Sequence, residues 1–231
     1  MKYICQHLGI GDHLITNGLV RTIIENGDQN EEYTMFVKPQ YIKSIAFMFR
    51  DIKNLKFMEA SAESALDFLR VNGVNQNDIT YAGFHWVDRY GSNFEQNFYK
   101  QNNIDFENKW SKFHLERDID RENSLYEQFR INEDYIFIHD DESRGFKIDS
   151  DKIPSNIRII RPDRNEYAYS DNVFDYIKII ENAKSVHCIE SSFLHLIDIM
   201  NLNNNIFLHK YVRKHPEDFF MPKYKNTKII E

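Results

Sequence analysis

The chain opens with a short apolar stretch, a turn built on two glycines and an amphipathic segment, and this order constrains the fold more than any other feature. Residues 2–6 have the composition of a buried strand. Apolar side chains then recur at helical spacing, at Leu14, Ile15, Leu19, Ile23 and Ile24. Between the two stretches, Gly9 and Gly11 allow a sharp turn and a close approach of the backbone to a ligand. The order predicts a strand–turn–helix unit, which is typical of an α/β sheet.

Asp12 lies where this helix is expected to begin, and two interpretations of it stay open. A helix start presents unpaired N–H groups and the positive end of the helix dipole, so it suits a phosphate or a developing oxyanion. Asp is also a common capping residue, so Asp12 either caps the helix or acts on a ligand there. The glycine pair lacks the third glycine of the dinucleotide fingerprint, which disfavours a flavodoxin-like or dinucleotide-dependent enzyme.

Length and composition favour a packed protein of one large or two small domains. The chain has 231 residues, of which 42% are hydrophobic and 14% aromatic. Its 29 basic and 36 acidic residues give a formal charge of −7, so we expect no nucleic-acid partner. Cys5 and Cys188 lie in apolar runs and predict buried thiols rather than a disulfide. With no signal peptide and no membrane-spanning run, we expect a soluble cytoplasmic protein, and leave peripheral contact with a membrane open.

Strand and helix patterns alternate along the chain. Strands are predicted at residues 2–6, 33–37, 55–58, 79–84, 135–139, 157–160, 185–189 and 206–208, the last of them ending the sheet. Helices are predicted at residues 14–24, 39–49, 61–69, 94–101, 173–183 and 191–200, with helical fragments at 110–113 and 124–129. Repeated strand–helix units predict a mostly parallel sheet with helices on both faces. Because the pattern restarts after a polar stretch, we predict two small αβ domains, residues 1–132 and 133–231.

Three turns that follow predicted strands carry the candidate chemistry. Ligands of open α/β sheets bind at the carboxyl ends of the strands. The first turn holds Asp12. In the second turn, Arg144 and Lys147 follow a strand that ends in His139. In the third turn, the hydroxyls of Ser191 and Ser192 lie at a helix start, where they suit a phosphate. Together these turns predict a diphosphate site on the second half and an acid on the first half.

Each of these residues also has a structural interpretation. In that interpretation Ser191 only caps the helix, and Arg144 is only a charge on the surface. His139 and His195 lie on otherwise apolar elements, where histidines are commonly hydrogen-bonded members of the core. The sequence 139–141, His-Asp-Asp, is a candidate metal site, although it lacks the spacing of an Asp-x-Asp motif.

At this point a family resemblance emerges. The stretch 9–12, Gly-Ile-Gly-Asp, with Leu19 in the following helix, resembles the N-terminal turn of the two-domain (GT-B) glycosyltransferases, above all the heptosyltransferase-like group. The stretch 190–196, Glu-Ser-Ser-Phe-Leu-His-Leu, is similar to the acidic C-terminal turn of that group. The segment 135–147 is similar to the strand and basic turn that open its donor domain. Glu190 stands where the group usually has Asp or Thr, and Ser191 where it has Gly or Thr.

The resemblance implies an α/β protein of two Rossmann-like domains with a cleft between them, residues 1–132 on the acceptor side and 133–231 binding the donor. It implies a glycosyltransferase, of the kind used in polysaccharide biosynthesis, that moves a sugar from a nucleotide diphosphate by direct displacement with Asp12 as base. The donor contacts that it implies come from Gly11, His139, Arg144, Lys147, Arg164, Glu190, Ser191, Ser192 and His195. We expect a nucleotide sugar and a glycan or lipid-linked acceptor as partners.

On the acceptor side, His13 is the second candidate for the base, and His85 and Trp86 form either an aromatic platform for a sugar or the edge of a core. We expect no metal and no cofactor, because no Asp-x-Asp motif follows an apolar strand. The basic residues Arg144 and Lys147 would stabilise the diphosphate in place of a metal. Two other functions stay open: a sugar-nucleotide epimerase or hydrolase on the same scaffold, and a binding protein with a degenerate site. The sequence leaves the sugar, the nucleobase, the acceptor and the oligomeric state undetermined.

Overall fold

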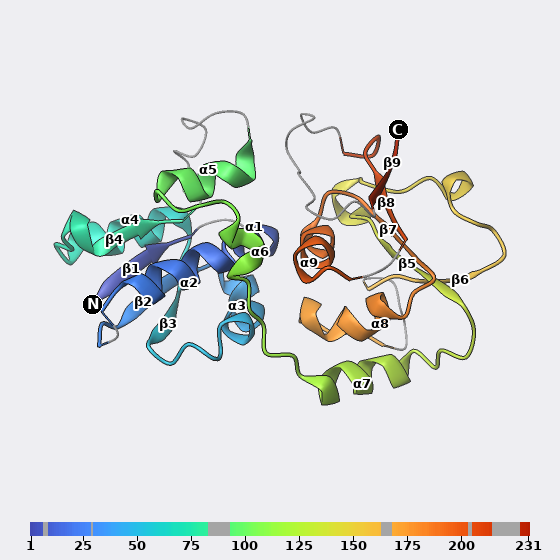
Figure 1. Ribbon diagram of the computed structural model, residues 1–231, viewed down its shortest axis with the longest axis horizontal. Coiled ribbons are helices and arrows are strands. Elements are labelled where there is room, and N and C mark those ends of the chain that lie inside the picture. The colour runs from blue at the N-terminus through green and yellow to red at the C-terminus, as the bar shows by residue number, and fades with distance from the viewer. Residues whose placement is uncertain (7–8, 29, 83–92, 163–167, 203–204, 214–226) are drawn as a thin grey trace. The chain divides into compact units, whose positions relative to one another are not determined.

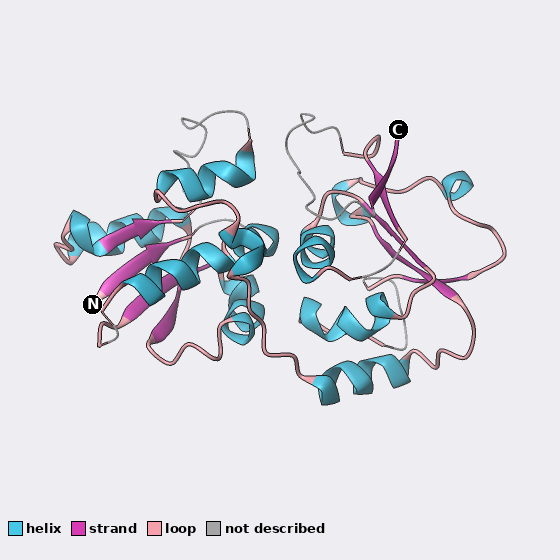
Figure 2. Ribbon diagram, viewed as in Figure 1, coloured by secondary structure: helices cyan, strands magenta, loops and turns pink. Residues whose placement is uncertain are grey.

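The computed structural model describes residues 1–6, 9–28, 30–82, 93–162, 168–202, 205–213 and 227–231. These residues form two compact units, each built around one parallel sheet (Figure 1). The described residues up to Glu116 belong to the first unit, and those from Arg117 onward belong to the second. Figure 2 shows that the strands of each unit gather in one sheet with helices beside it. The predicted α/β class with parallel sheets is therefore confirmed.

The first sheet has the strand order β3-β2-β1-β4, and every pairing in it is parallel. Its strands are β1 (Lys2–Cys5), β2 (Tyr33–Val37), β3 (Leu55–Glu59) and β4 (Ile79–Tyr81). Cys5 at the end of β1 pairs with Phe36 on one side and Tyr81 on the other, so these strands end at one edge. All four predicted strands are present, although the prediction for β4 runs on into residues 83–84, which lie outside the described residues.

The helical elements of the first unit follow the predicted order. They are α1 (Ile10–Ile15), α2 (Asn17–Asn26), η1 (Pro39–Tyr41), α3 (Ile42–Met48), α4 (Ala62–Val71), η2 (Gln76–Asp78), α5 (Phe94–Gln101) and α6 (Asn108–Ser111). The single helix predicted at residues 14–24 is wrong, because α1 and α2 meet at Thr16. The Thr16 hydroxyl donates to the carbonyl of Asp12 at 2.8 Å and accepts from Gln6 at 3.0 Å, and such back-bonding bends a helix. Gly18 in α2 lets the backbone of Asn108 approach closely, since a Cβ there would lie 1.8 Å from its carbonyl oxygen.

The second sheet has the order β6-β5-β7-β8-β9, again with parallel pairings only. Its strands are β5 (Tyr135–His139), β6 (Arg158–Ile160), β7 (Ser185–Cys188), β8 (Ile206–His209) and β9 (Thr227–Ile230). The prediction that the sheet ends with the strand at 206–208 is wrong, because β9 pairs with β8 along four positions. A half-exposed edge strand such as β9 does not show the continuous apolar run that marks buried parallel strands.

Different structures cover the two faces of the second sheet. On the face that presents Tyr135 and Phe137, the Tyr135 hydroxyl donates to the carbonyl of Ile179 in α8 (Ile177–Glu181) at 2.6 Å. On the same face, Phe137 contacts Phe193 of α9 (Ser192–Met200), with ring centroids 5.4 Å apart. The other face presents Ile136 and packs in one apolar cluster with Ile138, Ile148, Ile153 and Ile189. Among the described residues, an irregular segment with the short 3-10 helices η4 (Glu142–Arg144) and η5 (Ser150–Lys152) covers this face in place of α-helices. The prediction of helices on both faces is therefore wrong for this sheet.

The boundary between the units lies earlier in the chain than the predicted 132/133. Helix α7 (Ile119–Gln128) packs against α8 and η6 (Val173–Tyr176), both in the second unit. Arg121 of α7 donates twice to Asp175, at 3.0 and 2.7 Å, and Lys178 donates to Asn123 at 2.6 Å. The polar surface of α7 resembles a linker in the sequence, but its polar side chains bind it to the second unit.

Both cysteines are buried and free, as predicted. Burial raises the pKa of the Cys5 thiol to about 12, and it raises the pKa of Cys188 as well. Within the described residues, no helix is long and apolar enough to span a bilayer.

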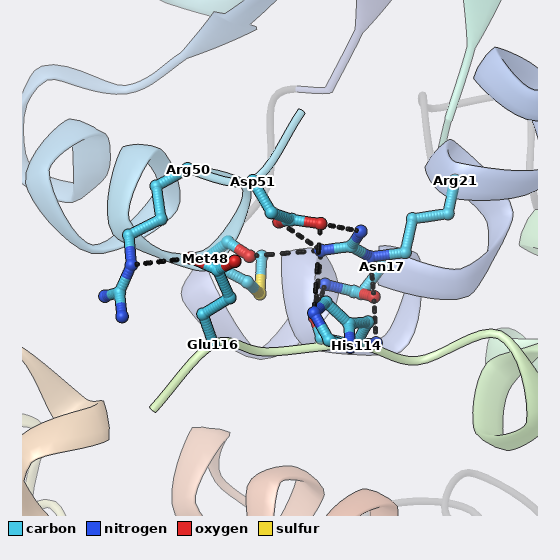
Figure 3. Close-up of polar contacts among 7 residues, drawn as sticks. All are labelled: Asn17, Arg21, Met48, Arg50, Asp51, His114 and Glu116. Atoms are coloured by element: carbon cyan, nitrogen blue, oxygen red, sulfur yellow. Dashed lines mark hydrogen bonds and ion pairs between the residues drawn. The ribbon is translucent and has the colours of Figure 1, made fainter. Parts of the chain in front are cut away.

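A buried arginine fixes the segment that leaves the first unit (Figure 3). Arg21 of α2 donates to both carboxylate oxygens of Asp51, at 2.7 and 2.9 Å, and to Asn17 at 3.0 Å. It also donates to the carbonyls of His114 at 3.0 Å and Met48 at 3.3 Å. Burial raises the pKa of Asp51, but the hydrogen bonds and charge of Arg21 outweigh it, so the pKa lies below its ordinary value.

We predict that Arg21→Ala destabilises the first unit by about 3 kcal/mol or more, because it removes the arginine donors from the Asp51 carboxylate and the Met48 carbonyl and leaves the His114 carbonyl with Asn17 as its donor. Urea unfolding measures the change. Arg70→Ala is the matched control, since the Arg70–Asp67 pair is exposed on the surface of α4 and its loss should change the unfolding free energy little. Equal effects of the two substitutions would contradict the anchoring role of Arg21.

A histidine pair lies in the core of the second unit. Nδ1 of His187 and Nε2 of His209 share a hydrogen bond of 2.9 Å, and both rings are buried. His187 also stacks on Phe207, its partner in the strand register, with ring centroids 4.5 Å apart. Burial lowers the pKa of both histidines to about 4, helped at His187 by His209 and at His209 by Lys152. Both are therefore neutral at pH 7.

We predict that stability is full above pH 6.5 and falls as the pH drops toward 4. In this window the unfolded chain protonates both histidines, whose unfolded pKa is about 6.5, while the folded chain does not. His209→Gln should make the dependence of the unfolding free energy on pH shallower. His114→Gln is the control, because that side chain is 57% exposed. Parallel pH curves for His209→Gln and the unaltered chain would show that the pair does not titrate as described.

Candidate functional site

In the first of the three candidate turns, Asp12 is the third residue of helix α1 and lies in its first helical turn. Gly9 is the N-cap residue, and its backbone is extended rather than left-handed. Its N–H donates to Oδ2 of Asp12 at 3.0 Å, so a capping interaction of Asp12 is present. A Cβ on Gly9 would meet that oxygen at 3.6 Å, an ordinary contact, so the backbone conformation does not itself demand glycine here. Gly11 lies in the same helical turn and is half-buried.

His13, the second candidate for the base, is only 1% exposed. It lies in the last turn of α1 beside the buried Leu14 and Ile15. This burial disfavours His13 as the base, because a buried side chain does not present its ring to an acceptor.

The second turn begins where β5 ends in His139. The carboxylate of the next residue, Asp140, is buried and accepts the N–H of Ile148 at 3.1 Å. Its other oxygen lies 3.9 Å from Nε of Arg161. Asp140 therefore holds the 140–148 loop in place. Within the described part of the chain, no group of three metal-ligating side chains comes together.

Arg144 and Lys147 lie in this loop, on the surface. Asp141 and Phe146 exchange two backbone hydrogen bonds of 2.9 Å, and Gly145 closes the turn with a φ of +81°, a left-handed conformation that favours glycine. Arg144 forms an ion pair with Asp141, and Lys147 forms one with Glu142 at 3.0 Å. Both cations are more than half exposed, and exposed ion pairs are weak, so a more highly charged anion can compete for them.

The third turn follows β7, which pairs with β5, and so it meets the second turn. Cys188 lies opposite His139 in the register, and the N–H of Ile189 donates to the carbonyl of His139 at 3.2 Å. Two residues later, Oγ of Ser191 shares a hydrogen bond of 2.9 Å with Nδ1 of His139. The His139 ring also lies 4.5 Å from the ring of Phe193. The structure thus brings together two of the predicted site residues, which are far apart in the sequence.

The contact with His139 changes how helix α9 begins. Ser191 is the N-cap residue of α9, yet its hydroxyl makes no capping hydrogen bond to the helix. Ser192 is the first residue of the helix and is half-buried. The first N–H groups of α9 therefore do not receive the side-chain acceptor that an N-cap serine normally supplies, and they are suited to an anion.

Glu190 and His195 flank this start and are both buried. The N–H of His195 donates to the carbonyl of Ser191 at 3.2 Å, as in an ordinary first helical turn. The carbonyl of Glu190 accepts a hydrogen bond of 2.9 Å from Arg213, a residue that the sequence analysis did not single out. The sequence signal that could have identified Arg213 is its position four residues after the end of β8, at the same sheet edge.

The remaining predicted contacts, His85, Trp86 and Arg164, lie outside the described residues. Asp12, Gly11 and His13 belong to the first unit. The structure gathers the others in the second unit, at or near the carboxyl ends of β5 and β7; these are His139, Arg144, Lys147, Glu190, Ser191, Ser192 and His195.

Comparison with known proteins gives matches among solved structures. No protein-family model matches the chain, and no curated protein matches it significantly. A glycosyl transferase of family 9 from Veillonella parvula DSM 2008 is similar over 99% of this chain and 86% of its own, with a TM-score of 0.62 and 8% identity. The E. coli ADP-heptose LPS heptosyltransferase II is similar over 100% of this chain and 90% of its own, with a TM-score of 0.60 and 11% identity. The chain shares the fold of these proteins, which confirms the resemblance to the heptosyltransferase-like group at the level of structure.

Proposed function

We propose that this chain is a glycosyltransferase that moves a sugar from a nucleotide-diphosphate donor to a hydroxyl of a glycan or lipid-linked acceptor. The observation that carries the proposal is the start of α9, where Ser191 bonds to His139 instead of capping the helix. This leaves an anion-suited helix start at the edge of the sheet where α/β proteins bind ligands. The shared fold with two glycosyltransferases supports the same function.

In this proposal the second unit binds the donor. The helix start of α9 faces the diphosphate with its N–H groups and its partial positive charge. Ser192 adds a hydroxyl, while Arg144 and Lys147 exchange their surface acids for the more highly charged diphosphate. As the sugar leaves, negative charge grows on the diphosphate, and these groups stabilise it where it develops.

The first unit supplies the base. The carboxylate of Asp12 accepts the proton of the acceptor hydroxyl while that oxygen attacks the anomeric carbon and the bond to the diphosphate breaks. The hydrogen bond from Gly9 is compatible with this role, because it holds one carboxylate oxygen and a carboxylate has about four lone-pair positions. The same contact fixes the side chain in one orientation, as a positioned base requires.

The direct test is transfer of sugar from a panel of nucleotide sugars to glycan acceptors, followed by mass spectrometry. ADP-heptose is the first donor to try, because the E. coli protein of the same fold is named for it. Transfer that depends on the acceptor supports the proposal. Hydrolysis of the donor at the same rate without acceptor would instead identify a hydrolase, and donor binding without turnover would identify a binding protein.

We predict that Arg144→Ala weakens binding of a nucleoside diphosphate by about 1.5–3 kcal/mol, the range for a hydrogen bond to a charged group. Calorimetry with ADP measures it. The matched control is Lys184→Gln, which removes one positive charge from the residue just before β7, at the opposite ends of the strands. Unchanged affinity in Arg144→Ala would remove Arg144 from the donor site.

We predict that transfer persists in excess EDTA. The carboxylate of Asp140 already holds Ile148 and Arg161, so the sequence 139–141 does not offer it as a metal ligand, and the basic groups take the place of a metal. Loss of activity in EDTA that Mn²⁺ or Mg²⁺ restores would overturn this and reinstate 139–141 as a metal site.

We predict that Asp12→Asn lowers turnover by about 10²–10⁴-fold while the melting temperature and the affinity for ADP hardly change. The asparagine oxygen still accepts the N–H of Gly9, but it cannot take a proton from the acceptor. Asp12→Ala is the companion variant, because it loses both the base and the acceptor for Gly9, and its melting temperature should fall. Near-normal transfer by Asp12→Asn would return Asp12 to a purely capping role.

A further inference from the structure

Arg213 follows a turn whose residues are fixed in the second unit. The preceding residues pack into the second unit: the Tyr211 hydroxyl accepts the N–H of Asp149 at 2.9 Å, and Val212 lies against the apolar cluster of the sheet. The backbone N–H of Lys210 donates to Ile230 in the neighbouring strand at 3.0 Å. Arg213 is thus held at the carboxyl end of β8, at the edge that also carries the start of α9.

The guanidinium of Arg213 joins two segments of the candidate donor site. One of its N–H groups donates to the carbonyl of Glu190 at 2.9 Å, just before the N-cap residue of α9. Its central carbon lies 5.6 Å from the ring centroid of Phe146, and that of Arg144 lies 6.0 Å from the same centroid. Two positive charges therefore gather around one aromatic ring at this edge of the sheet.

The two arginines differ in how their charges are balanced. Arg144 has Asp141 as its ion-pair partner. For Arg213, no carboxylate of the described residues lies within 4.0 Å, although the side chain is half-buried. A guanidinium has five N–H donors, and the contacts among described residues use one of those of Arg213. A half-buried cation with unused donors beside a second cation is stabilised by an anion.

We propose that Arg213 is a second anion-binding residue of the donor site, which with Arg144 and the start of α9 binds the diphosphate of a nucleotide sugar. The inference rests on the proposed function and names the part of the donor that the pair recognises. A diphosphate carries charge on two phosphoryl groups, so two guanidinium groups and a helix start match it. A monophosphate offers one such group and gains less from the second arginine.

The test is calorimetry with ADP, inorganic pyrophosphate and AMP on the full chain and four variants. Arg213→Ala removes the side chain, and Arg213→Gln keeps a donor for the Glu190 carbonyl without the charge. Arg213→Lys keeps the charge, and Lys184→Gln is the control for charge at the far ends of the strands. Melting temperatures show which variants fold, and if Arg213→Ala does not, Arg213→Gln and Arg213→Lys carry the test.

We expect Arg213→Ala and Arg213→Gln to weaken binding of ADP and pyrophosphate by about 10- to 100-fold, and of AMP by less. Arg213→Lys should retain part of the affinity, and Lys184→Gln should retain all of it. Normal binding by Arg213→Gln would overturn the proposal and show that Arg213 only holds the Glu190 carbonyl.

The outcome separates this inference from the proposed function. Normal ADP and pyrophosphate binding in every Arg213 variant overturns the inference alone. Pyrophosphate binding that depends on Arg213, without transfer from any nucleotide sugar, overturns the glycosyltransferase proposal and leaves the inference standing. If the unaltered chain binds neither ADP nor pyrophosphate, both are overturned.

Discussion

The parallel pairing of β5 with β7 is the constraint on which the candidate donor site depends. Its register sets Cys188 beside His139, and the chain beyond each strand leaves the sheet at the same edge. This allows Ser191 to reach His139 across 52 positions of sequence. Because the serine hydroxyl is used in that contact, the start of α9 keeps its amide groups for another acceptor. A change in the strand register would therefore alter both the histidine contact and the capping of the helix start.

In the first unit, buried ion pairs hold a segment of the chain in place. Arg21 and Asp51 hold the segment around His114, and Lys109 pairs with Glu95 at 2.5 Å with both side chains almost fully buried. Burying two charges costs free energy that their attraction only partly offsets, so such pairs add little net stability. Removing one partner is much more costly, because the other charge is left in the interior. These pairs thus specify where α6 and the residues around His114 pack.

The capping and catalytic interpretations of Asp12 are not exclusive. The structure has the hydrogen bond from Gly9 that the capping interpretation requires, and it places Asp12 in the first turn of α1 rather than at the N-cap. A contact that orients a carboxylate without neutralising it is also what a base needs. The sequence could not separate the two roles, because a carboxylate three positions after a glycine fits either.

The sequence by itself determined the strands that are buried on both faces and the helices with clear start signals. Tyr33–Val37 and Tyr135–His139 match the predicted bounds, since apolar runs of β-branched and aromatic residues mark buried parallel strands. The helix Phe94–Gln101 also matches, with the Asn93 side chain accepting the N–H of Gln96. The turns after strands identified most of the candidate site, because the carboxyl ends of parallel strands share one edge. Only the tertiary structure decided the added edge strand, the division before α7, the partner of Ser191 and the contact of Arg213 with the Glu190 carbonyl. Periodicity and capping are properties of neighbouring residues, whereas these features depend on which distant groups the register and the packing bring into contact.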